Sequence, residues 1–281
     1  MSGFDADWLA LREPVDHASR NAELAARVRA HFAGRAALTV VDLGCGTGSN
    51  LRGLAPLLPP CQHWHLIDGD PALLKAAGRR LGGWADSASP TETGIRLEKD
   101  GRRIEVRFEC ADLTARALDF ADSGDAGAEL VTAAALFDLV SEAWLERLVA
   151  GLALRRVPLY AVLNYDGAAR WQPADPLDAA TVAAFNRHQR GDKGFGPALG
   201  PAAGEALAHL LAQQGYRSWS GDSPWELGAA DSGLIAALTA GVARAAGDIE
   251  PARHAAFADW ARRRASAQAV TIGHQDIFAH A

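Results

Sequence analysis

Cysteine is scarce in this sequence, which has three cysteines among 281 residues. Cys45, Cys61 and Cys110 are odd in number and contain no CxxC pair, which argues against a disulfide framework and against a cysteine-based zinc site. His63 and His65 alternate along one predicted strand, and we interpret them as strand histidines rather than as metal ligands. The sequence therefore predicts reduced thiols and no bound metal.

Long apolar runs and an excess of positive charge are also missing. The first thirty residues lack a cleavage pattern of small residues and contain four acidic side chains, Asp5, Asp7, Glu13 and Asp16. This predicts neither a signal peptide nor a membrane span, and a cytoplasmic location. The formal net charge of −6 is typical of an ordinary solvated surface and not of a nucleic-acid-binding one. We therefore expect a small molecule as the partner, and no nucleic acid or membrane.

Short apolar runs rich in β-branched residues alternate with helical patterns along the chain. A hydrophobic content of 49% suits one α/β domain with insertions. Seven such runs predict strands, at residues 38–43, 63–67, 104–109, 129–134, 157–163, 216–220 and 270–278. Helical crossovers join parallel strands, so the alternation predicts a doubly wound, seven-stranded, mostly parallel sheet.

The remaining segments predict how the chain is organised around this sheet. Residues 1–35 have helical spacing and are expected to form an N-terminal helical cap on a main domain of residues 36–281. Residues 82–101 are polar and indicate a loop or a short hairpin. Residues 164–203 are too long for an ordinary loop and predict a lid over the active site, whereas residues 225–266 predict a helical insertion before the last strand.

A glycine-rich turn follows the first predicted strand, where residues 40–50 read VVDLGCGTGSN. Glycines allow a backbone to approach a ligand closely, and such a turn presents amides at the start of a helix. Its GxGxG spacing differs from the dinucleotide fingerprint GxGxxG, because the third glycine comes one place early. Asp68 ends the next strand, where a carboxylate can accept hydrogen bonds from both hydroxyls of a ribose.

These residues resemble the class I methyltransferases that depend on S-adenosylmethionine (SAM), over roughly residues 38–163 and more loosely up to the last strand. The resemblance implies SAM as the cofactor and S-adenosylhomocysteine as the product. It implies that Asp42 orients the turn and the methionine end of SAM. The backbone contacts would come from Gly44, Cys45, Gly46 and Gly48.

Five further residues are implied around the cofactor by the same resemblance. Asp68 would hold the ribose, Asp112 the adenine amino group with Leu113 beside it, and Ala133 would lie under the methionine moiety. The cofactor's carboxylate commonly meets a cation from the N-terminal helices, and Arg20 is the first candidate, ahead of Arg12. Each residue also has a structural interpretation: Asp42 as a buried turn-former, Asp112 as a helix cap, and the arginines as surface residues.

Methyl transfer is an in-line displacement, so the protein must align a nucleophile, exclude water and remove a proton from a weakly acidic acceptor. The resemblance places the acceptor near the ends of the fourth and fifth strands, which makes Asp138, Tyr165 and Asp166 candidate catalytic residues. In the lid, His188 is a candidate general base. A cap or salt bridge for Asp138, and a solvated loop for the lid, remain the alternatives.

The function that these residues favour is SAM-dependent methylation of a small polar or anionic metabolite on O, N or S. A nucleotide-binding oxidoreductase is disfavoured by the glycine spacing. A SAM-binding regulator or scaffold without catalysis is the main alternative, and a macromolecule methyltransferase is a further one.

Overall fold

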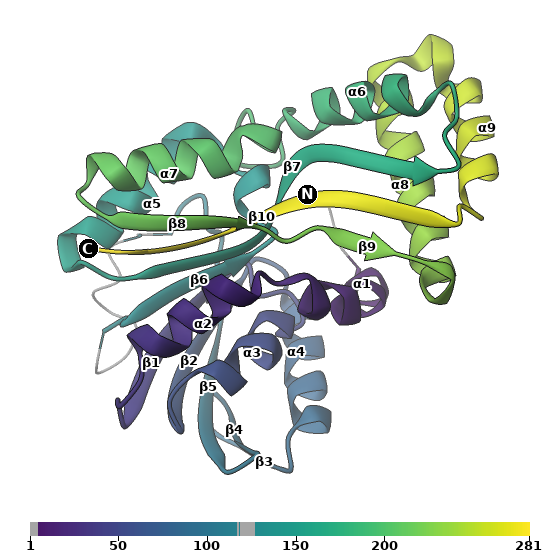
Figure 1. Cartoon of the computed structure of the whole chain (residues 1–281). Helices are drawn as coiled ribbons and strands as arrows, with labels where there is room; N and C mark the ends of the chain where they lie inside the picture. Colours follow the sequence, from purple (N-terminus) through teal and green to yellow (C-terminus); the bar gives the residue numbers. More distant parts are fainter. Residues whose placement is uncertain (1–4, 117, 119–126) are drawn as a thin grey trace.

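The computed structural model describes residues 5–116, 118 and 127–281. One mixed sheet runs through the molecule in the order β3-β4-β5-β2-β1-β6-β7-β10-β8, with β9 paired to β10 (Figure 1). Strands β5, β2, β1, β6 and β7 are parallel neighbours, whereas β10 is antiparallel to β7, β8 and β9. The strands are β1 (Ala37–Leu43), β2 (Cys61–Asp68), β3 (Ser87–Pro90), β4 (Gly94–Lys99), β5 (Arg102–Cys110), β6 (Leu130–Ala134), β7 (Leu159–Gln172), β8 (Arg217–Asp222), β9 (Trp225–Leu227) and β10 (Ala269–His280).

Helices cover both faces of the sheet. One face is covered by α2 (Ala22–His31), α3 (Ser49–Leu54) and α4 (Pro71–Trp84), and the other by α5 (Glu142–Arg155) and α7 (Ala203–Gln213) (Figure 1). Successive side chains of a strand point to opposite faces, so Val40 packs with the first layer and Val41 with the second. Because both layers are apolar, β1 is buried from Leu38 to Leu43, as expected of a parallel strand covered on both sides.

The predicted α/β fold is confirmed, but the described residues form ten strands rather than seven, and the sheet is mixed rather than mostly parallel because β3, β4, β8, β9 and β10 pair in the antiparallel direction. The seven predicted strands are β1, β2, β5, β6, β7, β8 and β10. The additional strands are short or solvated. β3 is exposed at every residue, and β9 has only three residues, so neither produces an apolar run. β3 and β4 form the hairpin that was one of two interpretations of residues 82–101.

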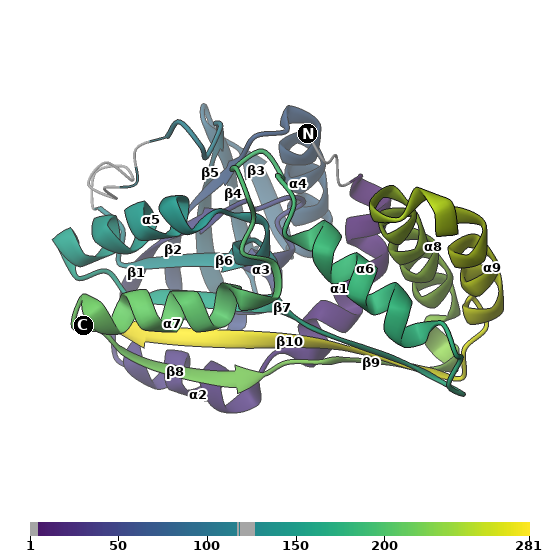
Figure 2. The same cartoon turned by 90° about the horizontal axis from the view of Figure 1, so that it is seen from above.

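Strands β7 and β10 extend well beyond the rest of the sheet as a ribbon, which the short strand β9 joins along β10. β7 continues to Gln172, so the prediction of a lid is wrong for residues 164–172. This half of the strand is buried on one side only, and its sequence therefore alternates instead of being apolar. The ribbon carries a third core with Trp171, Phe257 and Trp260, built by α6 (Asp178–Gln189), α8 (Ser232–Ile249) and α9 (His254–Arg264), which gather at one end of the molecule (Figure 2).

Helix α1 (Ala6–Ser19) lies between this third core and the glycine turn. It begins at Asp5, whose side chain accepts a hydrogen bond of 2.7 Å from the Trp8 amide. Trp8 packs against the third core, while Leu9 approaches Gly46. None of the described helices combines the length and the apolar character needed to cross a membrane.

Candidate functional site

The turn after β1 requires glycine at three positions. Gly44, Gly46 and Gly48 have φ of +64°, +53° and +75°, a region that side chains disfavour. A Cβ on Gly46 would lie 3.1 Å from Leu9 of α1, and one on Gly44 would lie 3.3 Å from Leu136. The turn is therefore constrained both by its backbone conformation and by side chains that pack against it.

Asp68, the predicted ribose ligand, is fixed at the mouth of this turn. Its Oδ2 accepts a hydrogen bond of 2.8 Å from the Gly46 amide, and its Oδ1 accepts one of 2.9 Å from the Asp70 amide. Burial raises the pKa of Asp68 although these amides oppose the shift. Each carboxylate oxygen can accept a second hydrogen bond, so the side chain is oriented but retains the capacity to bind hydroxyls.

A chain of buried polar groups runs behind the turn from Asp42 to Arg20. Asn50 donates to Asp42 Oδ1 at 2.7 Å and to Thr132 Oγ1 at 3.0 Å, and Arg20 Nη2 donates to Asn50 Oδ1 at 2.9 Å. Burial raises the pKa of Asp42 to about 7, against the hydrogen bond from Asn50 and the charge of Arg20. Asn50 was missed from the sequence, because it ends the glycine motif and lies in the first turn of α3.

Asp42 and Arg20 both keep polar atoms that are buried and unused. Within the described part of the chain, Asp42 Oδ2, Arg20 Nε and Arg20 Nη1 have no hydrogen-bond partner. Arg20 lies flat against α3, where a Cβ on Gly53 would come within 2.9 Å of its guanidinium carbon. A buried carboxyl group and a guanidinium, bridged by Asn50, therefore both keep free hydrogen-bonding capacity, an arrangement that is costly unless a ligand uses it.

The residues predicted around the adenine and the methionine moiety lie at the ends of β5 and β6. Asp112 is exposed, and its Oδ1 accepts a hydrogen bond of 2.8 Å from the Thr114 amide; hydrogen bonding by the Thr114 side chain, and then by this amide, lowers the pKa of Asp112. Leu113 and Ala133 are buried in the core beneath α5. Cys45 is buried at 6% exposure; its amide donates to the Ile67 carbonyl at 3.0 Å and its carbonyl accepts from the Gly48 amide at 2.9 Å, so its backbone holds the turn in place.

Two of the predicted catalytic residues come together beyond the end of β6. Asp138 follows β6 in a short 3-10 turn, Phe137–Leu139, and is 5% exposed. Burial raises its pKa to about 6, opposed by its own backbone amide, the Tyr165 amide and the charges of Arg12 and Lys193. Its Oδ1 lacks a partner among the described residues. Tyr165 donates its phenolic hydrogen to Asn186 of α6 at 2.8 Å.

His274 on β10 belongs to the same group and was missed. It pairs in register with Tyr165 of β7, and the two ring centroids are 6.2 Å apart. Burial and the charge of Arg12 lower its pKa to about 3, so the ring is neutral, and Nδ1 has no partner in the part of the chain that is described. The polar residues His274 and Asp276 in the middle of a predicted strand were the signal that could have indicated it.

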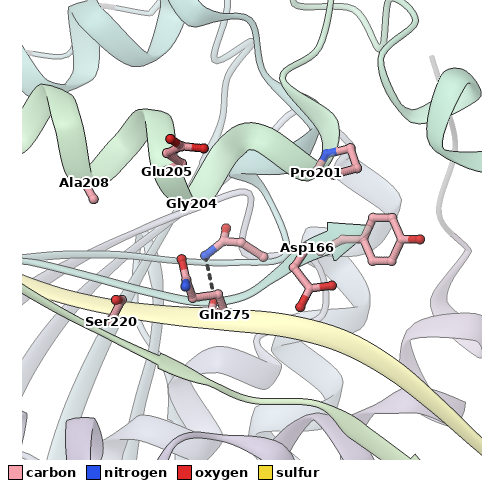
Figure 3. A pocket seen from close by; sticks show the side chains of 9 residues that line it. Asp166, Pro201, Gly204, Glu205, Ala208, Ser220 and Gln275 are labelled. Atoms are coloured by element: carbon pink, nitrogen blue, oxygen red, sulfur yellow. Dashed lines mark hydrogen bonds between the residues drawn. The ribbon is translucent and has the colours of Figure 1, made fainter. Parts of the chain in front are cut away.

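Asp166 and His188 lie elsewhere. Asp166 is exposed, and it points to the opposite face of β7 from Tyr165, because successive strand residues alternate. It lines a cavity of about 340 Å³ beneath α7, together with Glu205, Ser220 and Gln275 (Figure 3). His188 ends α6, where its Nδ1 lies 3.1 Å from Lys193 Nζ; burial and this cation lower its pKa.

No protein-family model and no curated protein matches this sequence. The structure is nevertheless similar to solved structures at low sequence identity. It matches the YcgJ protein of Bacillus subtilis with a TM-score of 0.51 and 12% identity, covering 92% of this chain and 98% of that one. It matches a putative methyltransferase from Bacillus halodurans with a TM-score of 0.51 and 11% identity, covering 91% and 97%.

A third similar structure is the cyclopropane synthase MmaA2 of Mycobacterium tuberculosis. Its TM-score is 0.51 at 11% identity, over 98% of this chain and 94% of that one. Likeness at such identity concerns the fold, and it extends over almost the whole of each chain. The chain has the fold of the class I SAM-dependent methyltransferases.

Proposed function

We propose that this chain transfers a methyl group from SAM to a small polar metabolite. The observation that carries the proposal is that Asp42 and Arg20, which Asn50 bridges beside the glycine turn, each keep buried polar atoms without a hydrogen-bond partner among the described residues. The amino-acid end of SAM carries an ammonium and a carboxylate, so it would supply a donor for Asp42 Oδ2 and acceptors for Arg20 Nε and Nη1.

The rest of the site fits the same cofactor. Asp68 is oriented for the ribose hydroxyls, and Asp112 and Leu113 lie where the adenine is expected. SAM, when bound, supplies a methyl group on a sulfonium centre. The chain's own contribution is to hold the two substrates in line and to exclude water, and helix α1 with the third core covers the acceptor side.

Asp138 is the favoured proton acceptor among the four catalytic candidates. It is buried, it lies at the end of β6, and one of its oxygens is unused. Its raised pKa of about 6 leaves it largely ionised at neutral pH yet basic enough to accept a proton, as general-base catalysis requires. Tyr165 borders the same place, whereas Asp166 faces the other side of the strand.

Calorimetric titration with SAM tests the cofactor site. Asp68→Ala and Arg20→Met are each expected to weaken SAM binding by about 1 to 3 kcal/mol, the cost of leaving polar partners unpaired. Arg29→Met, an exposed arginine of α2, is the matched control and should bind SAM as the wild type does. Unchanged affinity in both site variants would remove these residues from the cofactor site.

Labelled SAM tests the activity itself. Methyl transfer into the small-molecule fraction of a metabolite extract is the expected result. Tight SAM binding without transfer would instead favour a non-catalytic regulator or scaffold. Label recovered in protein or nucleic acid would favour a macromolecule methyltransferase.

A further inference from the structure

We propose that Asp138, His274 and Arg12 form an acceptor subsite for an uncharged aromatic compound that carries a hydroxyl or amino group. This inference rests on the proposed methyl transfer, and it narrows the acceptor from polar metabolites in general to one chemical class. Its foundation is a pair of side chains, on different elements, that are more than nine-tenths buried and have unused hydrogen-bonding atoms.

Both side chains lie next to Tyr165. Asp138 lies against the backbone of Tyr165, and Tyr165 and His274 are cross-strand partners on one face of the ribbon. Asp138 Oδ1 and His274 Nδ1 are buried and unpartnered within the described residues. Together they form a hydrogen-bond acceptor and a neutral imidazole around Tyr165, which suits a compact group that can donate a proton.

Arg12, on α1, lies next to the same group of side chains. Its guanidinium carbon lies 5.1 Å from the centroid of the Trp225 ring, and the Trp225 ring centroid is 5.1 Å from that of His274. The positive charge of Arg12 alters the pKa of both Asp138 and His274. Arg12 is therefore close to both members of the pair, although the three residues are far apart in the sequence.

The charges around the subsite are already matched within the protein. Arg12 Nε donates to Asp16 Oδ2 at 2.8 Å, and Asp138 is opposed by Arg12 and Lys193. Lys193 also lies in the field of Asp248. No cation is left without an opposing carboxylate among these groups, so an anionic acceptor would gain little and would meet Asp138. An uncharged acceptor avoids that repulsion.

Aromatic rings supply the walls. Trp225 lies beside His274, His274 lies beside Tyr165, and the ring centroid of Phe185 is 5.5 Å from that of Tyr165 in an edge-on arrangement. Flat aromatic molecules pack well against such edges and faces. An acceptor with an aromatic body and one hydrogen-bond donor would therefore satisfy both the apolar walls and the buried carboxylate.

The chemistry balances with SAM as the methyl donor. The acceptor's O–H or N–H proton passes to Asp138 Oδ1 while a new bond forms between that oxygen or nitrogen and the methyl carbon. The carbon–sulfur bond of the sulfonium breaks, and its electron pair stays on sulfur to give S-adenosylhomocysteine. Neutral His274 positions the acceptor and takes no proton in this step.

Four probes test the class of acceptor on the wild-type chain: 4-methylphenol, 4-methylaniline, 4-methylanisole and 4-hydroxyphenylacetate. Their dissociation constants are measured by NMR titration with S-adenosylhomocysteine present. The first two should bind at least about tenfold more tightly than 4-methylanisole, which lacks the donor, and than 4-hydroxyphenylacetate, which is anionic. Equal or tighter binding of either comparison compound, or no binding of any probe, would overturn the proposal.

Two substitutions test the residues. Asp138→Asn and His274→Phe should each weaken 4-methylphenol binding about tenfold while SAM affinity stays at the wild-type value. The matched controls Glu146→Gln and His209→Phe change exposed residues and should change neither affinity. In transfer assays with 4-methylphenol, His274→Phe should raise KM and Asp138→Asn should lower kcat. Wild-type probe affinity in both site variants would refute the subsite.

The two proposals fail in different ways. If the wild type selects 4-methylphenol but does not bind SAM, the methyltransferase function fails while the subsite stands. If SAM binds and methyl groups move to anionic compounds, the function stands and the subsite fails. The probe panel requires no substitution, so a variant that does not fold leaves the proposal open to refutation.

Discussion

Replacement of Asp276 is expected to destabilise this protein more than replacement of any residue of the cofactor turn. Asp276 lies on β10 with no exposed surface. Its Oδ1 accepts hydrogen bonds from the Leu163 amide at 2.8 Å and from Ser223 Oγ at 2.6 Å, and its Oδ2 accepts one from the Asn21 amide at 2.9 Å. One carboxylate thus joins the start of α2, strand β7 and the segment between β8 and β9.

The magnitude follows from those donors. Asp276→Ala leaves three donors without their partner, each worth about 1 to 3 kcal/mol when buried. Relaxation and entry of water reduce the total to about 3 to 5 kcal/mol, the range for removing one partner of a buried charged group. Single domains are stable by about 5 to 15 kcal/mol, so this is a large share of the total.

Two milder substitutions should give smaller losses of stability. Asp276→Asn keeps an acceptor oxygen for Leu163 and Ser223 and removes a buried charge, but it turns an amide group toward the Asn21 amide; we expect a loss of about 1 to 2 kcal/mol. Ser223→Ala removes one hydrogen bond and should cost about 1 kcal/mol.

Urea unfolding at pH 7, followed by circular dichroism, measures these losses from the midpoint and slope. The expected order of stability is wild type, Ser223→Ala, Asp276→Asn and then Asp276→Ala. An Asp276→Ala variant within 1 kcal/mol of the wild type would refute this account, because it would show that the three donors find other partners at little cost.

Three further outcomes are expected. The pKa of His274 is lowered to about 3 in the folded protein, so only the unfolded chain takes up a proton at this histidine near pH 6.5, and the free energy of unfolding falls as the pH drops below that value. His274→Phe should therefore remove about 2 kcal/mol of the stability loss that urea unfolding measures between pH 7 and pH 5. An unchanged dependence of stability on pH in this variant would contradict the prediction. Gly46→Ala should cost about 1 to 2 kcal/mol of stability and weaken SAM binding in calorimetry, because Gly46 has a positive φ and Leu9 is close to it. The control Gly83→Ala in α4, which has open space around it, should change neither stability nor SAM affinity by such an amount. The pKa of Asp138 is raised to about 6, so kcat should rise between pH 5 and pH 7 as this carboxyl group ionises. Asp138→Asn should lower kcat by about 10²- to 10⁴-fold and abolish this rise. A variant that kept the wild-type pH profile would exclude Asp138 as the base.

The core of the fold could be predicted because buried parallel strands are apolar on both sides. Residues 38–43 and 130–134 need no context to be identified as strands. The second half of β7 could not be identified in this way, because only one of its faces is buried. Its sequence alternates Tyr165, Gly167, Ala169 and Trp171 with exposed residues, a period of two that was hidden among glycine and charged side chains.

The candidate site likewise has one part that the sequence indicated and one part that it did not. Local motifs indicated the cofactor candidates Asp42 and Asp68, because the glycine turn and both carboxylates lie at the ends of strands that could be predicted from the sequence. The acceptor side depends on contacts between distant segments: Arg12 and His274 meet through Trp225. Such contacts follow from strand register, which single-sequence patterns do not determine. Polar residues inside predicted apolar strands, such as His274 and Asp276, were the available signal.

Helix α1 mechanically connects the two halves of the site. On one side, Glu13 forms two hydrogen bonds of 2.6 Å with Arg52 of α3, and His17 lies 3.0 Å from the Ser49 carbonyl oxygen. On the other, Asp16 accepts a hydrogen bond of 3.0 Å from Trp225. A ligand that shifts this helix from either side changes the affinity of the other ligand, and linkage requires the factor to be the same in both directions. We therefore expect α1 to carry a coupling free energy between SAM and the proposed acceptor, and two titrations performed in opposite order measure it.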